Sequence, residues 1–327
     1  MKALVTGGAG FIGSHVVDRL VAAGHQPRLL DLKTSPYHAE GELETVLVDL
    51  TDATGVRRAV RGCDAILHLA AMADVDEVVG DPARTNAVNV GGTFNLLEAA
   101  RAEGIERFLY ASTVWVYGNA PGEEPHDEDT PLVLPPHLYT ATKLAGEMYC
   151  RAYETLYDVP TTILRFGIPY GPRARPAAVV PAFIGKAIRG EPLTIAGDGS
   201  QARQFVYVED LAEGMVAALV PAARGRIYNL VGDEMVTVRQ IADAVRELVA
   251  DVPIVHGPER PADLRFGRAS SARAHAELGW LAETSFSIGV RRYVDSLGVT
   301  SGSPVASAAS STAGSASTVL RQEPSAL

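Results

Sequence analysis

The stretch "ALVTGGAGFIGSH", residues 3–15, joins a short apolar run to a glycine-rich turn. Gly7, Gly10 and Gly13 recur at every third position, immediately before an amphipathic segment. Glycines permit a tight turn and a close backbone approach to a pyrophosphate, and the first N–H groups of the next helix attract that anion. The position of this turn after an apolar strand predicts a dinucleotide site, in which we expect Phe11 and Ile12 to contact the ligand.

The rest of the first half alternates short apolar runs with longer amphipathic segments. We expect strands at residues 2–6, 27–31, 44–48, 64–70, 107–112 and 161–166, and helices near 12–23, 52–61, 82–103 and 138–157. Strands that are apolar almost throughout indicate a parallel sheet with helices on both faces. The predicted fold class is therefore α/β, a doubly wound parallel sheet of the Rossmann type, over residues 1–171.

After Gly171-Pro172 the pattern becomes less regular. Short strand-like runs ("LTI", "QFVYV", "RIYNLV") are separated by helical segments near 179–189, 209–219 and 237–250. We expect residues 172–297 to form mainly a smaller lobe that faces the substrate. Residues 298–327 are rich in serine, alanine and glycine and lack periodicity, which predicts a disordered tail.

Composition excludes several classes of function. The 327-residue chain has a formal net charge of −10, so we expect no nucleic-acid partner. It has no apolar run of about 18 residues and only a short apolar run near its start, so we expect a cytoplasmic protein without a membrane span. Cys63 and Cys150 lie far apart and outside any Cys/His cluster, which argues against a disulfide framework or a metal site.

Acidic residues follow the second and third predicted strands. A carboxylate at Asp31 can accept hydrogen bonds from the adenosine ribose and would repel a 2′-phosphate, which favours NAD over NADP. Asp49 could accept a bond from the adenine amino group while Leu50 packs on the ring. Alternatively, Asp49 could cap the helix expected from residue 52.

Tyr139 and Lys143 in "LYTATKL" are four residues apart, which places them on one face of a helix. A free tyrosine has a pKa of about 10, too high for a base at neutral pH. We expect the Lys143 ammonium and the positive nicotinamide ring to lower the pKa of Tyr139. The fifth strand ends near Thr113, so Thr113 and Tyr139 can approach one substrate hydroxyl at the carboxyl edge of the sheet.

With these motifs the chain resembles the extended short-chain dehydrogenase/reductase family, the nucleotide-sugar epimerases and dehydratases. The matching segments are "TGGAGFIGSH", "HLAA" (68–71), "NVGGT" (89–93), "STVWVYG" (112–118), "YTATK" (139–143), "YGP" (170–172), "RQFVYVED" (203–210), "YNLVG" (228–232) and "RPADLR…ELGW" (260–280). The resemblance implies a Thr113/Tyr139/Lys143 triad and a homodimer paired through the helices near 82–103 and 138–157. It also implies an NAD site with Asn89 close by; the residues that we expect to hold NAD are Gly7, Gly10, Phe11, Ile12, Gly13, Asp31, Asp49, Leu50, Ala70, Asn89, Tyr139 and Lys143.

The residues after Thr113 narrow the expected reaction. Relatives that eliminate water carry an Asp-Glu pair there, and the decarboxylases carry a glutamate at the second position. This chain has Val114 and Trp115, which cannot transfer protons. What remains is hydride transfer at a sugar hydroxyl, and the resemblance implies an NAD-dependent epimerase that inverts C4 through a transient 4-keto sugar.

A nucleotide-sugar carries a diphosphate, for which arginine is the favoured partner. By resemblance we expect Arg203 and Arg260 to bind the diphosphate, Asp263 the nucleotide ribose and Thr113 the sugar; Arg173 and Arg175 are further candidates. Ile168 and Ala178 stand where relatives often carry substrate-binding asparagines. Gly267 falls about where the 4-epimerases that the chain resembles use side-chain size to limit the substituent at C2, and a glycine there suggests room for an N-acetyl group.

Two other functions remain open. A nucleotide-sugar reductase or dehydrogenase would use the same triad but exchange its cofactor at each turnover. A non-catalytic protein that senses NAD would keep the dinucleotide fold, yet it would not need Thr113, Tyr139 and Lys143 together.

Overall fold

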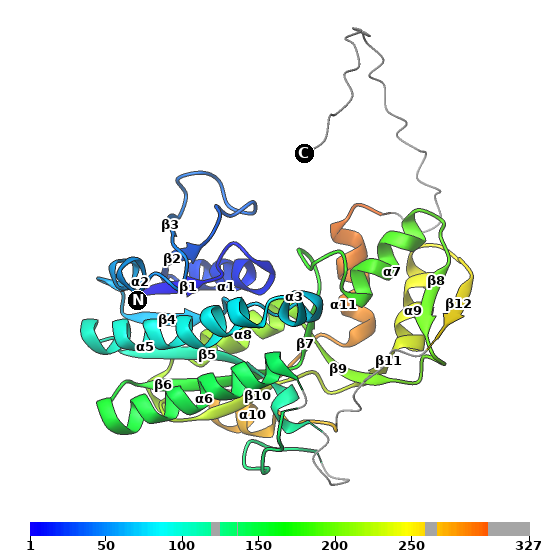
Figure 1. Ribbon diagram of the computed structural model, residues 1–327. Coiled ribbons are helices and arrows are strands. Elements are labelled where there is room, and N and C mark those ends of the chain that lie inside the picture. Colours follow the sequence, from blue (N-terminus) through cyan, green and yellow to red (C-terminus); the bar gives the residue numbers. More distant parts are fainter. Residues whose placement is uncertain (119–124, 136, 259–266, 300–327) are drawn as a thin grey trace, which may run out of the picture.

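The computed structural model describes residues 1–118, 125–135, 137–258 and 267–299. Within these residues the chain forms a larger and a smaller lobe (Figure 1). The larger lobe is built on a seven-stranded sheet in the order β10-β6-β5-β4-β1-β2-β3, with every neighbouring pair parallel. Its strands are β1 (Lys2–Thr6), β2 (Gln26–Asp31), β3 (Glu44–Leu47), β4 (Ala65–His68), β5 (Arg107–Thr113), β6 (Thr161–Phe166) and β10 (Ile227–Leu230).

Helices cover both faces of this sheet because its strands are apolar on both sides. Ala3 and Val5 of β1 pack into one core and Leu4 into the other. The first core is covered by α1 (Phe11–Ala22), α8 (Val208–Ala217) and α10 (Ala272–Leu278), and the second by α2 (Ala53–Val60), α5 (Gly92–Glu103) and α6 (Leu138–Tyr157). The predicted doubly wound α/β fold is confirmed.

The segment predicted as one helix over 82–103 has three parts in the structure. It begins as α4 (Pro82–Asn86), passes through the π-helical turn η1 (Ala87–Gly91) and continues as α5. A short helix, α3 (Val75–Gly80), precedes it, and a 3₁₀ turn, η2 (Val114–Tyr117), follows β5. A π-helical turn inside an α-helix frequently marks a functional site.

The smaller lobe has its own core beside the sheet of the larger lobe. Its strands form a three-stranded sheet of β11 (Met235–Thr237), β9 (Ala202–Tyr207) and β7 (Ile168–Tyr170), and a pair of β12 (Ile254–Gly257) and β8 (Leu193–Ala196). Around them pack α7 (Val179–Ile188), α9 (Val238–Leu248) and α11 (Phe286–Ser296). The chain crosses between the lobes more than once, because β10, α8 and α10 all return to the larger lobe; a short 3₁₀ turn, η3 (Pro221–Ala223), precedes β10.

Strand order reverses between β1 and β4. The chain moves outward from β1 through β2 to β3, and then crosses back to β4 on the other side of β1. In doubly wound sheets the ligand lies in the crevice at this reversal, beyond the carboxyl ends of the strands. None of the helices in the described ranges is long and apolar enough to cross a membrane.

A buried ion pair holds α6 against the sheet. Arg165 on β6 and Glu147 on α6 form two hydrogen bonds, of 2.8 and 3.0 Å, and both side chains are almost fully buried. Glu147 also accepts a bond from Ser112 on β5, and Arg165 donates to the Tyr117 hydroxyl at 2.9 Å. The pair therefore fixes the helix that carries Tyr139 relative to the strand that ends in Thr113.

We predict that Glu147→Gln lowers the free energy of unfolding by about 3–5 kcal/mol, because the Arg165 charge is then buried without a carboxylate. Urea unfolding followed by circular dichroism measures this change. The double variant Glu147→Met/Arg165→Met should lose less, since it buries no charge.

The matched control is Glu191→Gln, which breaks the exposed Arg189–Glu191 pair and should leave the urea midpoint unchanged. If Glu147→Gln shifts the midpoint no more than this control does, the Glu147–Arg165 pair does not hold the site together.

Candidate active site

The glycine turn after β1 leaves no space for side chains. Gly7 has a φ of 70°, and a Cβ on it would lie 3.1 Å from the Ala70 backbone. A Cβ on Gly13 would lie 2.1 Å from the Gly7 carbonyl oxygen. Gly10 is the N-cap of α1 and supplies no side-chain bond to the first N–H groups of the helix, which Phe11 and Ile12 begin. A narrow turn that opens onto an uncapped helix start fits a dinucleotide pyrophosphate.

Asp31 is the last residue of β2 and its carboxylate is held at this turn. One oxygen accepts a 3.0 Å hydrogen bond from the Ala9 N–H, and the other accepts a 2.7 Å bond from the Leu32 N–H. The predicted ribose-binding carboxylate therefore lies beside the glycine turn and is only partly exposed.

Asp49 does not cap α2, so that alternative prediction is wrong. The cap is Asp52, which accepts a bond from the Gly55 N–H at 3.0 Å. Asp49 instead accepts two bonds from Thr51, of 2.8 and 2.9 Å, and pairs with Arg84. Leu50 is buried against Gly92 of α5.

A buried histidine connects β1 to the segment after β4. The Thr93 hydroxyl donates to the Asn89 carbonyl at 2.6 Å, so it must accept the 2.9 Å bond from His68 Nε2. The other ring nitrogen of His68 then accepts from the Thr6 hydroxyl at 2.8 Å, and that hydroxyl accepts from the Ala70 N–H at 3.1 Å. Burial, with a smaller effect of the Lys143 charge, lowers the pKa of His68 to about 3. The neutral ring thus fixes Ala70 over the glycine turn.

The three predicted catalytic residues come from β5 and α6. Thr113 is the last residue of β5, and Tyr139 is the second residue of α6. Lys143 is one helical turn further on, and its ammonium donates a 2.8 Å bond to the Ala111 carbonyl. The ammonium nitrogen lies 6.0 Å from the centre of the Tyr139 ring. The two elements thus bring the three side chains to the carboxyl edge of the sheet.

The predicted effect of Lys143 on Tyr139 is not found. Burial raises the pKa of Tyr139 to about 12, and the charge that opposes this rise is that of Arg175. Burial also lowers the pKa of Lys143 to about 8. The prediction was wrong for the side chains of this chain because the four-residue spacing says nothing of desolvation, which outweighs an ammonium at this distance.

Asn89 lies in the π-helical turn and is almost fully buried. Its amide group accepts from the Met72 N–H at 2.8 Å and donates to the Met72 carbonyl at 2.9 Å. It also donates to the Thr142 hydroxyl at 3.1 Å, and Thr142 donates to the Tyr139 carbonyl at 2.8 Å. Asn89 therefore couples the segment after β4 to the first turn of α6.

The Trp115 ring borders Tyr139 and His137 packs on Trp115, and sequence reasoning connected neither with Tyr139. The Trp115 ring meets Tyr139 edge to face, with 6.2 Å between ring centres, and lies 5.5 Å from His137. His137 is the N-cap of α6, and burial lowers its pKa, so its ring is neutral at neutral pH. Its place two residues before Tyr139 was the available signal.

The predicted substrate residues are only partly described. Arg260 and Asp263 lie outside the described residues. Arg203 lies on β9, where its guanidinium donates to the Ala202 carbonyl at 2.8 Å. Arg173 and Arg175 are engaged with Asp18 and Asp74, at 2.8 and 3.0 Å. Ile168 begins β7, and Ala178 is the N-cap of α7.

The space beside Gly267 is filled. A Cβ on Gly267 would lie 2.4 Å from Nε2 of His126, whose ring stacks on Tyr117. The expected room for an N-acetyl group is therefore not found in the direction of a Gly267 side chain, because the His126 ring occupies it.

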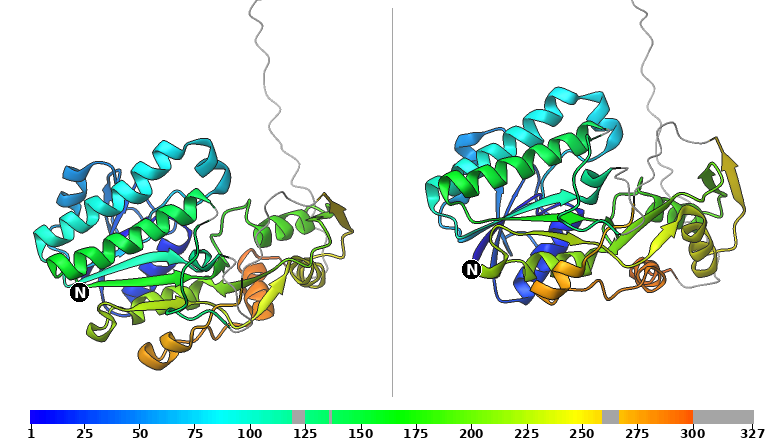
Figure 2. Two further views of the ribbon diagram at one scale, coloured as in Figure 1. Left: turned by 60° about the horizontal axis from the view of Figure 1, so that its bottom comes forward. Right: turned by 90° about the horizontal axis from the view of Figure 1, so that it is seen from below.

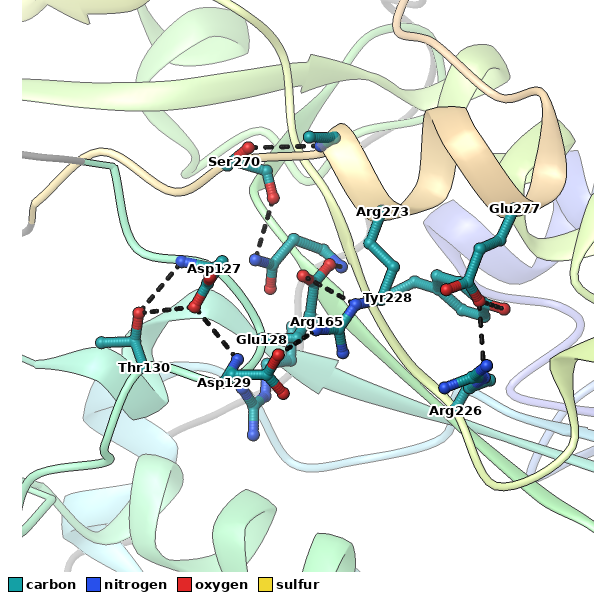
Figure 3. A network of polar contacts seen from close by, with 12 residues as sticks. Asp127, Glu128, Asp129, Thr130, Arg165, Arg226, Tyr228, Ser270, Arg273 and Glu277 are labelled. Atoms are coloured by element: carbon teal, nitrogen blue, oxygen red, sulfur yellow. Dashed lines mark hydrogen bonds and ion pairs between the residues drawn. The ribbon is translucent and has the colours of Figure 1, made fainter.

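A polar network fixes the chain that follows Gly267 (Figure 3). Glu128 accepts a 2.7 Å bond from the Asn229 N–H, and the Asn229 side chain donates to the Ser270 carbonyl at 3.0 Å. Arg273 on α10 lies 3.6 Å from Glu128 and 2.5 Å from Asp129. These contacts join α10, β10 and the loop after η2. No group of His, Cys, Asp or Glu side chains in the described part of the chain could hold a metal ion.

Comparison with known proteins gives the family. A family model described as "NAD dependent epimerase/dehydratase family" matches residues 3–231. A UDP-glucose 4-epimerase of Mycolicibacterium smegmatis is 37% identical, covering 90% of this chain and 98% of its own. A dTDP-glucose 4,6-dehydratase of Neisseria gonorrhoeae is 33% identical, covering 89% of this chain and 94% of its own. The crystal structure of a Thermus thermophilus UDP-glucose 4-epimerase in complex with NAD superposes with a TM-score of 0.83. It is 38% identical and covers 90% of this chain and 98% of its own. The chain thus belongs to the NAD-dependent epimerase/dehydratase family, an assignment that agrees with its glycine turn, Asp31 and the Tyr139–Lys143 pair.

Proposed function

We propose that this protein is an epimerase that inverts C4 of a nucleotide-activated sugar and uses NAD. The observation that carries the proposal is the contact between Trp115 and Tyr139. An indole ring and, at position 114, an isopropyl group stand where water elimination or decarboxylation needs a carboxyl group. His137, whose ring lies 5.5 Å from Trp115, has a pKa lowered by burial and is neutral at neutral pH.

The side chains of the site can assist this reaction without further acids or bases. NAD, when bound, supplies a hydride acceptor. Tyr139 exchanges a proton with the C4 hydroxyl, and the Thr113 hydroxyl, at the end of β5, orients that group. Lys143 is fixed by its bond to Ala111, 6.0 Å from the centre of the phenol ring. The positive nicotinamide ring of NAD, when bound, would favour the phenolate. Asn89 and Thr142 hold the first turn of α6 in place. We propose that Arg203, together with Arg260 and Asp263, binds the nucleotide part of the substrate.

We predict that Tyr139→Phe lowers kcat by at least about a hundredfold and leaves NAD binding unchanged, because only the proton-transferring hydroxyl is lost. Turnover is measured with the best nucleotide-sugar, and NAD binding by calorimetry. Tyr157→Phe, on the exposed side of the same helix, is the matched control and should retain full turnover. Undiminished turnover in Tyr139→Phe would remove Tyr139 from the mechanism.

A panel of UDP-, dTDP- and GDP-sugars decides between the candidate reactions. We expect one of them to interconvert with its C4 epimer, with no net formation of NADH and no loss of water, as followed by NMR and absorbance at the NADH band. A 4-keto-6-deoxy product would contradict epimerisation. Cofactor consumed one-for-one with product would support the reductase or dehydrogenase instead.

We also propose that the protein is a homodimer paired through α5 and α6, which lie side by side on one face of the sheet (Figure 2). This face exposes several large apolar side chains: Phe94, Met148, Tyr149, Leu156 and Tyr157. The Phe94 ring packs on Tyr149 with 6.1 Å between ring centres, which makes the two helices one apolar surface.

We predict that Tyr149→Asp shifts the sedimentation coefficient from that of a dimer to that of a monomer, because a carboxylate would then be buried in the apolar interface. Ile288→Asp, at another exposed apolar position on α11, should remain dimeric. A wild-type protein that sediments as a monomer at micromolar concentration would contradict the interface.

A further inference from the structure

A short segment crosses the crevice in which family members bind NAD. It comprises residues 171–175, Gly-Pro-Arg-Ala-Arg, and connects β7 to the turn before α7 (Figure 1). We call it the strap. Sequence reasoning treated its arginines only as possible phosphate ligands, whereas the structure shows them paired with acidic residues of the larger lobe.

One end of the strap is fixed to α1. His15, two residues beyond Gly13, donates a 3.0 Å bond from Nε2 to the Pro172 carbonyl. Arg173 pairs with Asp18 at 2.8 Å, and its guanidinium lies 4.7 Å from the centre of the Tyr37 ring. Asp18 in turn accepts a 2.9 Å bond from His38. The strap is thus anchored to the first turns of α1 and to the loop after β2.

The other end is fixed across the crevice. Arg175 pairs at 3.0 Å with Asp74, which is the N-cap of α3 and follows β4. Helix α1 follows β1, and α3 follows β4, so the two anchors stand on opposite sides of the point where the strand order reverses. A dinucleotide bound at that point would lie between the two anchors of the strap.

The backbone of the strap depends on these contacts. Arg173 has a φ of 67°, in the left-handed region that residues other than glycine seldom adopt. Such a conformation persists only where the surroundings impose it. Because the Arg173 side chain makes the anchoring contacts, loss of its charge should free the backbone to relax and the strap to lift.

We propose that the strap retains NAD, so that the cofactor leaves only after the Arg173–Asp18 anchor opens. This proposal goes beyond the proposed epimerase reaction. It requires only that the protein binds NAD, as its family does, and not that it inverts C4. Slow release of NAD suits an epimerase, which regenerates NAD in each turnover. It would slow a reductase or dehydrogenase, which must exchange its cofactor.

The test measures how fast the holoenzyme releases labelled NAD into excess unlabelled NAD, with no sugar present. Arg173→Gln should release NAD about three- to tenfold faster than the wild type, because it loses a partly exposed ion pair and a cation–π contact. Asp18→Asn removes the same pair from the other side and should act in the same direction.

Arg19→Gln is the matched control, since it breaks the Arg19–Glu213 pair on the neighbouring position of α1 without touching the strap. It should release NAD at the wild-type rate. Wild-type release from both Arg173→Gln and Asp18→Asn, or equally fast release from the control, would overturn the proposal. Because no sugar is turned over, the result holds whether or not the C4 reaction is correct.

Discussion

The close approach of helix α1 to the end of strand β1 is the constraint on which the site depends. A Cβ at Gly13 would collide with the Gly7 carbonyl, so the turn closes only with glycine at this position. The same approach brings the Ala70 backbone against Gly7 and Asp31 against the Ala9 N–H. The ends of β1, β2 and β4 therefore meet around one small volume, and the helix start faces into it.

Buried polar groups keep that geometry rigid. His68 joins Thr6 to Thr93 as a neutral ring, and the bidentate Glu147–Arg165 pair joins α6 to β6. Each of these groups has its hydrogen-bonding partners, so desolvation is offset where it would otherwise destabilise the fold. Through Thr6 the His68 ring is connected to the Ala70 N–H, and through Thr93, Asn89 and Thr142 it is connected to the Tyr139 carbonyl. Glu147 binds Ser112, the residue before Thr113. Hydrogen bonds of the buried core therefore stabilise the site together with the loops around it.

Local patterns predicted the elements because their signals lie within a few residues. Helix α6 begins and ends where its amphipathic pattern predicted, and β1, β2, β5 and β6 agree with the predicted strands to within a residue. The return of β10 to the large sheet could not be predicted, since it depends on pairing with β6, some sixty residues earlier. The Trp115–Tyr139 contact and the His126 ring beside Gly267 likewise arise from packing between distant segments. The pKa of Tyr139 was misjudged because spacing reveals proximity and not burial.

Burial of Tyr139 connects the strap to the chemistry. Desolvation raises the pKa of the phenol, and a positive charge nearby opposes that rise. Arg175 is the side chain whose charge opposes the rise, and it is held in place by Asp74 at one end of the strap. A strap that lifted would carry this charge away from the phenol. The opening of the strap that we propose would therefore both uncover the crevice and remove the charge that opposes the rise in the pKa of Tyr139.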